Sequence, residues 1–312
     1  MIAVTFRGAG GPEVMSVAER PDPVPGDHEV LVRATHAGLN PADIAQRAGN
    51  YPAPPGSPAD IPGLEVAGTV AACGARVVDW RPGDRVFGLV GGGGLADTVA
   101  VHERHLARVP DELSDRDAAA VPEAFITAHD AVFTRAGLVT GETLLVNGAS
   151  GAVGTAAIQL GVAAGARVLA NARSHRDALA ALGAEPCSLD DADGADVVLE
   201  LVGAANLPGS LEALALRGRI VVVGTGAGAD AELSLRLLMG RRATLMGTLL
   251  RARAMEEKAA AVQAFARAVL PHLAAGRVRP VLDRVFPVAE AAAALDHLSA
   301  PGKLGKVLLE FG

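Results

Sequence analysis

The chain contains few cysteines and few aromatic residues. Among its 312 residues are two cysteines, one tryptophan and one tyrosine, and aromatic residues make up 3% of the total. Two cysteines exclude a disulfide scaffold and a four-thiolate metal site, and they are typical of a reducing compartment. We therefore expect a cytoplasmic protein.

Basic runs and long apolar runs are also missing. The net charge is -7, which argues against a nucleic-acid partner. No apolar run reaches the length needed to span a membrane, and the first residues carry no cationic, apolar signal segment. With 50% hydrophobic residues, the composition is that of a globular, soluble protein long enough for two domains.

The most informative stretch covers residues 143–174. It reads as a strand, a glycine turn at 148–154, a helix and a second strand. A glycine turn between strand and helix lets backbone N–H groups and a helix N-terminus face a pyrophosphate. We expect a dinucleotide there, although an ordinary strand–helix turn without a ligand remains the alternative. The predicted contacts are Ser150, Gly151, Ala152, Val153 and Gly154.

The second strand of this unit bears on which dinucleotide binds. NAD sites usually place a carboxylate about 20 residues beyond the glycines, on the ribose hydroxyls. Here the segment contains Arg173, Ser174 and Arg176, and no acid before Asp177. The two arginines and the serine suit a 2′-phosphate, so the sequence favours NADPH, with a solvated basic loop as the alternative.

The chain as a whole predicts an α/β protein with two domains. Residues 1–120 contain short β-like runs separated by Pro and Gly clusters, as in a small barrel, whereas 121–262 alternate helix and strand, as in a parallel sheet. We expect residues 1–121 and 263–312 to form one domain, 122–262 to form the nucleotide domain, and the cofactor to lie in the cleft between them. The expected helices are 124–136, 207–216, 255–276 and 289–298, and a last strand at 306–311 should close the first domain's sheet.

Several sequence blocks, in order, resemble one known family. They are GLNPADIAQRAGNYPAPPG, IPGLEVAGTV, PGDRVFGL, AAVPEAFITAHDAVF, GTLLRAR, PVLDRVFPVAEAAAALDHL and GKLGKVLLEF. With the glycine-turn segment, they resemble the zinc-free quinone oxidoreductase branch of the medium-chain dehydrogenases/reductases, which includes zeta-crystallin and, nearer still, the tumour-suppressor-inducible quinone oxidoreductases. The resemblance implies a GroES-like barrel domain, a doubly wound Rossmann domain, NADPH and a dimer or tetramer.

The same resemblance predicts that no metal is bound. Zinc enzymes of this superfamily use a cysteine and a histidine where this chain has Asn40 and Leu64. Leucine cannot coordinate zinc, and the remaining thiolates are too few to complete a tetrahedral site. His102 and His105 are three residues apart, but no cysteine or third ligand lies near them in sequence, so a solvated loop is the better interpretation.

By resemblance, Tyr51 lines the acceptor site and Asn40 faces the nicotinamide, and these two are the predicted catalytic residues. Tyr51 could instead only anchor its loop through the ring. Asp43 and Arg47, four residues apart, could simply pair with each other. Further predicted cofactor contacts are Thr127, Gly224, Thr225, Gly247, Thr248, Leu249 and Lys306. Thr127 could equally bond its own helix backbone, and Lys306 could be a structural cation.

Without a Lewis acid, the predicted chemistry is hydride transfer from NADPH to an acceptor that is already electron-poor. A quinone is the leading hypothesis. Reduction of an α,β-unsaturated carbonyl, with Tyr51 or water giving the proton, is the alternative within enzymes. A non-catalytic NADPH-binding structural or redox-sensing protein is the alternative of another class.

Two departures from the family pattern affect the expected shape. Thr98 stands where relatives usually carry an aromatic residue, which predicts a wide, aliphatic pocket. The interval between Pro186 and Asp196 is too short for a full crossover helix, so a loop bearing Asp190, Asp191 and Asp193 should replace it.

The apolar stretch 243–249 is compatible with an edge strand that pairs with the same strand of a second copy of the chain, which predicts a homodimer.

Overall fold

The computed structural model describes all 312 residues, and the chain divides into two compact units. Unit 1 comprises residues 1–126, 250–276 and 282–312, and unit 2 comprises 127–249 and 277–281. The sequence pattern predicted boundaries at 121/122 and 262/263. Residues 250–262 belong instead to unit 1, because helix α8 (Met255–Ala274) packs against strands β6 and β8 of that unit.

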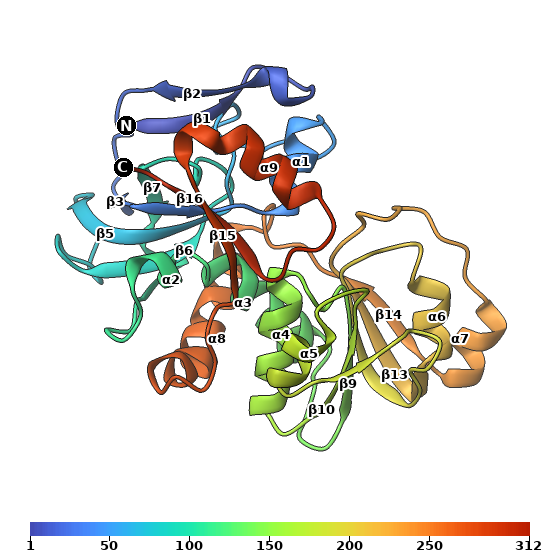
Figure 1. Ribbon diagram of the computed structural model, residues 1–312. Coiled ribbons are helices and arrows are strands. Elements are labelled where there is room, and N and C mark those ends of the chain that lie inside the picture. The colour runs from blue at the N-terminus through green and yellow to red at the C-terminus, as the bar shows by residue number, and fades with distance from the viewer. The chain divides into compact units, whose positions relative to one another are not determined.

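Unit 1 is built mainly on antiparallel strands, as expected for the barrel-like domain, with β15 and β16 as its one parallel pair (Figure 1). A five-stranded sheet has the order β7-β3-β5-β6-β8, a three-stranded sheet the order β15-β16-β4, and β1 pairs with β2. The predicted last strand is present and closes unit 1, because β16 pairs antiparallel with β4. The strands are β1 (Ile2–Phe6), β2 (Met15–Glu19), β3 (Glu29–Arg33), β4 (His36–Gly38), β5 (Glu65–Cys73), β6 (Arg85–Leu89), β7 (Thr98–His102), β8 (Leu106–Arg108), β15 (Leu282–Pro287) and β16 (Lys306–Glu310).

Helices cover the strands of unit 1. Helix α8 buries one side, on which Phe265 lies with its ring centroid 5.9 Å from that of Phe87 in β6. Helix α9 packs on β15 and β16, where the predicted helix 289–298 is split into a 3-10 turn and an α-helix. No helix of the structure has both the length and the apolar character to cross a membrane. The remaining helices of this unit are η1 (Pro12–Val14), α1 (Pro41–Arg47), η2 (Glu103–His105), α2 (Asp115–Ala118), η4 (Val288–Glu290) and α9 (Ala291–Ser299).

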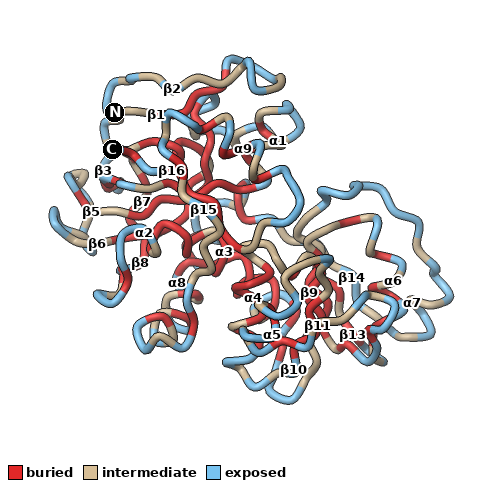
Figure 2. Tube along the Cα trace, viewed as in Figure 1, coloured by how far each residue is buried: buried red, intermediate tan, exposed pale blue.

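Unit 2 contains a six-stranded, fully parallel sheet of order β11-β10-β9-β12-β13-β14. This is the strand order of a doubly wound dinucleotide-binding fold, so the predicted fold class is confirmed. The central strands of this sheet, β9 and β12, consist mainly of buried aliphatic residues (Figure 2). The strands are β9 (Thr143–Asn147), β10 (Arg167–Asn171), β11 (Glu185–Cys187), β12 (Ala195–Glu200), β13 (Leu214–Val222) and β14 (Thr244–Gly247).

The connections of unit 2 differ from the prediction in two places. The expected helix 207–216 ends at Glu212, because Leu214 is fully buried and pairs beside Ala195 as the first residue of β13. The expected helix 124–136 changes to a π-helical turn after His129. The short link between β11 and β12 contains no helix, as predicted. The helices are α3 (Pro122–His129, which begins in unit 1), η3 (Asp130–Arg135), α4 (Ala152–Ala163), α5 (Arg176–Ala181), α6 (Leu207–Glu212) and α7 (Leu235–Arg241).

Candidate active site

A buried ion pair joins the last strand of unit 1 to its five-stranded sheet. The Lys306 ammonium lies 2.5 Å from Glu65 Oε1, and both side chains are almost fully buried. Lys306 also donates to Asn40 Oδ1 at 2.6 Å, while Asn40 Nδ2 donates to Glu65 Oε1 at 2.9 Å. A side chain at Gly38 would collide with both charged groups, so this approach requires glycine.

Asp43 holds the loop beside this pair. Its carboxylate accepts the backbone N–H of Asn40 at 2.8 Å and that of Gly63 at 3.0 Å. Complete burial raises the pKa of Asp43 to about 6, although these bonds and the nearby cations act against the shift. Asp43 does not pair with Arg47, which instead lies 3.8 Å from Asp296. The possible Asp43–Arg47 pair is therefore wrong, because Asp43 points inward to cap its own helix.

Tyr51 is held by a buried arginine from a distant part of the chain. Arg251 is 4% exposed, and its guanidinium lies 4.9 Å from the centroid of the Tyr51 ring. The guanidinium donates to the backbone oxygens of Tyr51 and Gly91, at 2.9 and 2.8 Å, and to Gln46 Oε1 at 2.5 Å. Burial raises the pKa of Tyr51 even though the Arg251 charge acts to lower it. The phenol is therefore fixed in place and weakly acidic.

Two further charged groups complete this cluster. Lys258 is 6% exposed and donates to the backbone oxygen of Arg251 at 3.0 Å. The backbone N–H of Glu123, at the start of α3, donates to Glu65 Oε2 at 2.9 Å. Burial, with the negative charge of Glu65 second, raises the pKa of Glu123 to about 7. Burial therefore disfavours the ionised form of Glu123.

Asn40 and Leu64, which replace the zinc ligands of related enzymes, do not suit a metal. Leu64 is buried at 3% exposure, and Asn40 is committed to Glu65 and Lys306. An ammonium already neutralises Glu65, so a divalent cation would have to displace it. His105 faces the backbone oxygen of Met255, and no group of three His, Cys, Asp or Glu side chains in the chain is arranged to hold a metal ion. The donor set does not fit zinc.

In unit 2 the glycine turn has the geometry that a dinucleotide requires. Gly148 has φ +76°, and Gly151 caps helix α4 with no side chain bonded to the free N–H groups. A Cβ on Gly154 would lie 2.6 Å from the Gly148 oxygen and 2.7 Å from that of Ala149, so only glycine allows this close packing of helix and strand. The twelve-residue helix therefore presents free donors where a pyrophosphate is expected.

A buried carboxylate that no motif in the sequence revealed supports the end of strand β12. Glu200, fully buried at the end of β12, accepts the backbone N–H groups of Val202 and Gly203 through Oε1. Its Oε2 accepts Asn147 Nδ2 at 2.6 Å and Ser210 Oγ at 3.0 Å. The four bonds fix the carboxyl ends of β9 and β12 relative to each other.

The residues predicted to select the cofactor follow strand β10. Arg173 and Arg176 are exposed, and Ser174 is partly exposed. Arg176 donates to the backbone oxygen of Pro186 at 2.7 Å, while His175 has φ +62°. Their role toward a 2′-phosphate stays a prediction.

The other predicted cofactor residues of unit 2 lie at or near the carboxyl ends of its strands. Gly224 and Thr225 follow β13, and Gly247 ends β14. Thr248 donates to Asp130 Oδ2 at 3.2 Å, and Leu249 is 49% exposed. All carboxyl ends of a parallel sheet meet at one edge, where ligands bind in open α/β folds. Thr127, a buried residue of α3, completes the set within this unit.

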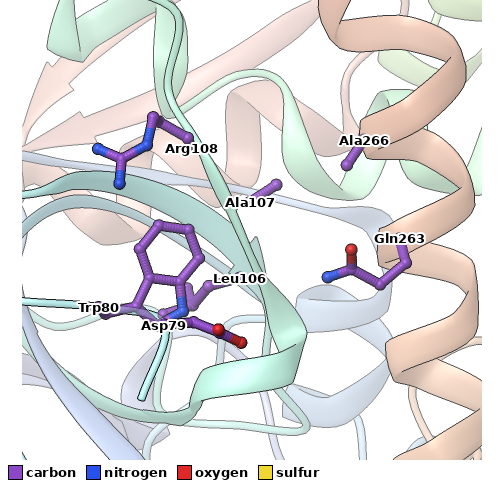
Figure 3. A pocket seen from close by; sticks show the side chains of 7 residues that line it. All are labelled: Asp79, Trp80, Leu106, Ala107, Arg108, Gln263 and Ala266. Atoms are coloured by element: carbon purple, nitrogen blue, oxygen red, sulfur yellow. The ribbon is translucent and has the colours of Figure 1, made fainter. Parts of the chain in front are cut away.

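The predicted residues thus separate into Asn40, Tyr51 and Lys306 in unit 1 and the remainder in unit 2. Unit 1 also has a hollow of about 350 Å³ that contains none of them (Figure 3). There the Arg108 guanidinium lies 5.5 Å from the centroid of the Trp80 ring, and Trp80 Nε1 donates to the backbone oxygen of Glu103. This hollow contains no group of the charged cluster.

Comparison with known proteins identifies the family. Residues 26–111 match the alcohol dehydrogenase GroES-like domain, and residues 165–309 match the zinc-binding dehydrogenase family. The chain is 32% identical to the quinone oxidoreductase of Lama guanicoe, covering 99% of this chain and 97% of that protein. The chain belongs to the quinone oxidoreductase branch of the medium-chain dehydrogenases/reductases. It is an oxidoreductase of a family that uses a nicotinamide cofactor.

Solved structures agree with this assignment. This medium-chain dehydrogenase/reductase superimposes on an alcohol dehydrogenase superfamily protein from Novosphingobium aromaticivorans with a TM-score of 0.88 and 33% identity, covering 99% of each chain. It matches a quinone oxidoreductase of Pseudomonas syringae pv. Tomato DC3000 with a TM-score of 0.85 and 28% identity, again over 99% of each. The family resemblance found in the sequence is confirmed.

Proposed function

We propose that this chain is an NADPH-dependent quinone oxidoreductase that works without zinc. The observation that carries the proposal is the cluster around Lys306, whose ammonium contacts Asn40 Oδ1 and the Glu65 carboxylate. By resemblance, Asn40 stands where related enzymes have a cysteine ligand of zinc. A site without a Lewis acid suits acceptors that are electron-poor from the start, and quinones are such acceptors.

The chain's residues then act mainly by binding and orientation. A bound reduced nicotinamide supplies hydride, and the free N–H groups at the start of α4 suit its pyrophosphate. Arg173 and Arg176 favour the 2′-phosphate of NADPH over the bare ribose of NADH. Tyr51, held under Arg251, offers a fixed ring against which a planar acceptor can stack.

The proposal is tested by following NADPH oxidation against a panel of quinones and α,β-unsaturated carbonyl compounds, with identification of the products. We expect turnover with quinones, slower turnover with NADH, and no loss of activity after treatment with a chelator. NADPH binding without turnover of any acceptor would instead support a non-catalytic NADPH-binding protein and would refute the proposal.

A further inference from the structure

We propose that the buried Glu200 acts through Asn147 to turn the Asn171 side chain so that its Oδ1 meets the adenosine ribose of the cofactor. Asn171 is then a specificity-determining residue, and Glu200 is a positioning residue that touches no ligand. The inference rests on the proposed function, because it concerns how NADPH is bound. It involves only residues of unit 2.

The first support is the position of Asn171 in the sheet. It is the last residue of β10, about 20 residues beyond the glycine turn, where NAD enzymes carry the carboxylate that holds the ribose. Its backbone oxygen accepts the N–H of Ala149 in that turn at 3.3 Å, so the two segments are in direct contact. The Asn171 side chain is partly exposed, whereas Asn147 and Glu200 are fully buried.

The second support is a chain of hydrogen bonds that runs from Glu200 to Asn171. Glu200 Oε2 accepts Asn147 Nδ2 at 2.6 Å and Ser210 Oγ at 3.0 Å. Asn147 Nδ2 also donates to Ser210 Oγ at 2.7 Å. Asn147 Oδ1 accepts Asn171 Nδ2 at 2.9 Å. Both ends of the Asn147 amide are therefore bonded within the protein.

The direction of this chain follows from the chemistry of its first member. A carboxylate accepts hydrogen bonds and donates none, so Asn147 must present its NH₂ group to Glu200. The Asn147 Oδ1 then faces Asn171, which must present its own NH₂ group in return. Asn171 Oδ1 is left on the far side of its amide, without a bond to the protein, where it can accept from a ribose hydroxyl.

An amide at this position suits NADPH in charge as well as in hydrogen bonding. The 3′-hydroxyl of the NADPH ribose can donate to Asn171 Oδ1, and a neutral amide does not repel the adjacent 2′-phosphate as a carboxylate would. Arg173, two residues further along, is exposed and supplies positive charge. Asn171 thus holds the sugar, while the arginines select the phosphate.

Replacing Glu200 by glutamine should reverse the chain. The new amide oxygen must still accept the N–H groups of Val202 and Gly203, which Oε1 now accepts at 2.8 and 2.9 Å, so its NH₂ group faces Asn147. Asn147 then turns its Oδ1 inward and donates to Asn171, which presents Nδ2 to the ribose. No hydrogen bond is lost, so Glu200→Gln alone should change the dissociation constants of both cofactors by no more than about threefold.

The decisive test places a carboxylate at position 171 in two backgrounds at pH 8. In Asn171→Asp the new carboxylate meets Asn147 Oδ1, and Glu200 prevents that amide from turning. The urea midpoint of unfolding, followed by circular dichroism, should fall by roughly 0.3 M or more. Adding Glu200→Gln lets Asn147 turn and donate to the carboxylate, so most of the loss should return. Adding Glu212→Gln instead, at an exposed position at the end of α6, is the matched control and should restore nothing.

Cofactor affinity is a readout that a merely structural role would not move. In fluorescence titrations, Asn171→Asp with Glu200→Gln should bind NADH about tenfold more tightly than Glu200→Gln alone, because a correctly held carboxylate can take both ribose hydroxyls. The same double variant should bind NADPH at least about tenfold more weakly, since its carboxylate faces the 2′-phosphate. Asn171→Ala should raise KM for NADPH about fivefold and leave kcat unchanged, because the ribose contact is remote from the nicotinamide.

Each contrary outcome overturns a defined statement. If Glu200→Gln does not restore the stability of Asn171→Asp, or if Glu212→Gln restores it equally, Glu200 does not set the direction of the chain. Unchanged affinities for both cofactors in Asn171→Ala and in the double variant refute the ribose contact and leave the proposed function standing. A wild type that binds NADPH but turns over no acceptor refutes the proposed function, while the affinities still decide the inference. A wild type that binds neither cofactor refutes both.

Discussion

Replacing Lys306 by methionine should strongly destabilise unit 1. Methionine has a similar length but no charge, so the Glu65 carboxylate would stay buried without the ammonium that now lies 2.5 Å away. Glu65 would keep only two neutral donors, the Asn40 amide and the Glu123 backbone N–H. Removing one partner of a buried ion pair typically costs about 3–5 kcal/mol of the free energy of unfolding, and we expect a loss in that range at pH 8.

The assay can be confined to the unit concerned. Trp80 is the single tryptophan and belongs to unit 1, so its fluorescence during urea unfolding reports on the unit that contains the ion pair. Lys303→Met is the matched control, because Lys303 is near in sequence and its ammonium bonds the Ala300 oxygen at the surface. That control should change the free energy of unfolding by no more than about 0.5 kcal/mol.

A second substitution checks the physical reason. Adding Glu65→Gln to Lys306→Met removes the uncompensated charge, and the new amide can bond both the Asn40 side chain and the Glu123 N–H, so at least half of the lost free energy should return. A deficit below about 1 kcal/mol at pH 8, or no recovery in the double variant, would refute this account.

Four further predictions concern the proposed function. Tyr51→Phe should retain most of the quinone turnover, because the ring still stacks under Arg251; a loss of about 10²-fold in kcat with intact NADPH binding would make the phenol the acid. Replacing Arg173 and Arg176 together by alanine should weaken NADPH binding by tenfold or more, about 1.4 kcal/mol, with little effect on NADH, as measured by titration. Elemental analysis should find no stoichiometric zinc, and one tightly held zinc per chain would contradict the proposed mechanism. Light scattering should give a homodimer that Leu245→Arg disrupts, because β14 is an edge strand with a partly exposed Leu245; a monomeric wild type would disprove the assembly.

Local patterns in the sequence were sufficient for most of the fold. The turn at 148–154 is predictable because glycine conformations and the flanking apolar periodicities are local properties. The loop between β11 and β12 is predictable from chain length alone. The end of helix α6 was not, because the alanines and leucines between 212 and 216 suit a helix as well as a buried strand, and only pairing with β12 decides.

The candidate site was predictable only in part. Asn40, Tyr51 and Lys306 were singled out from the sequence, but their partners were not. Lys306 contacts the Glu65 carboxylate, 241 positions earlier in the chain. Arg251 donates to the backbone oxygen of Tyr51, 200 positions away. Periodicity and motif spacing do not predict contacts between residues that lie so far apart in the chain.

The position of β16 has a consequence for the order in which the molecule is completed during synthesis. The ribosome releases β4, β5 and the side chains of Asn40 and Glu65 long before Lys306, and all of unit 2 emerges in between. Until β16 pairs with β4, Glu65 has no ammonium beside it and cannot be buried at low cost. We therefore expect unit 2 to mature on the nascent chain first, while unit 1 stays open to water until its last strand arrives.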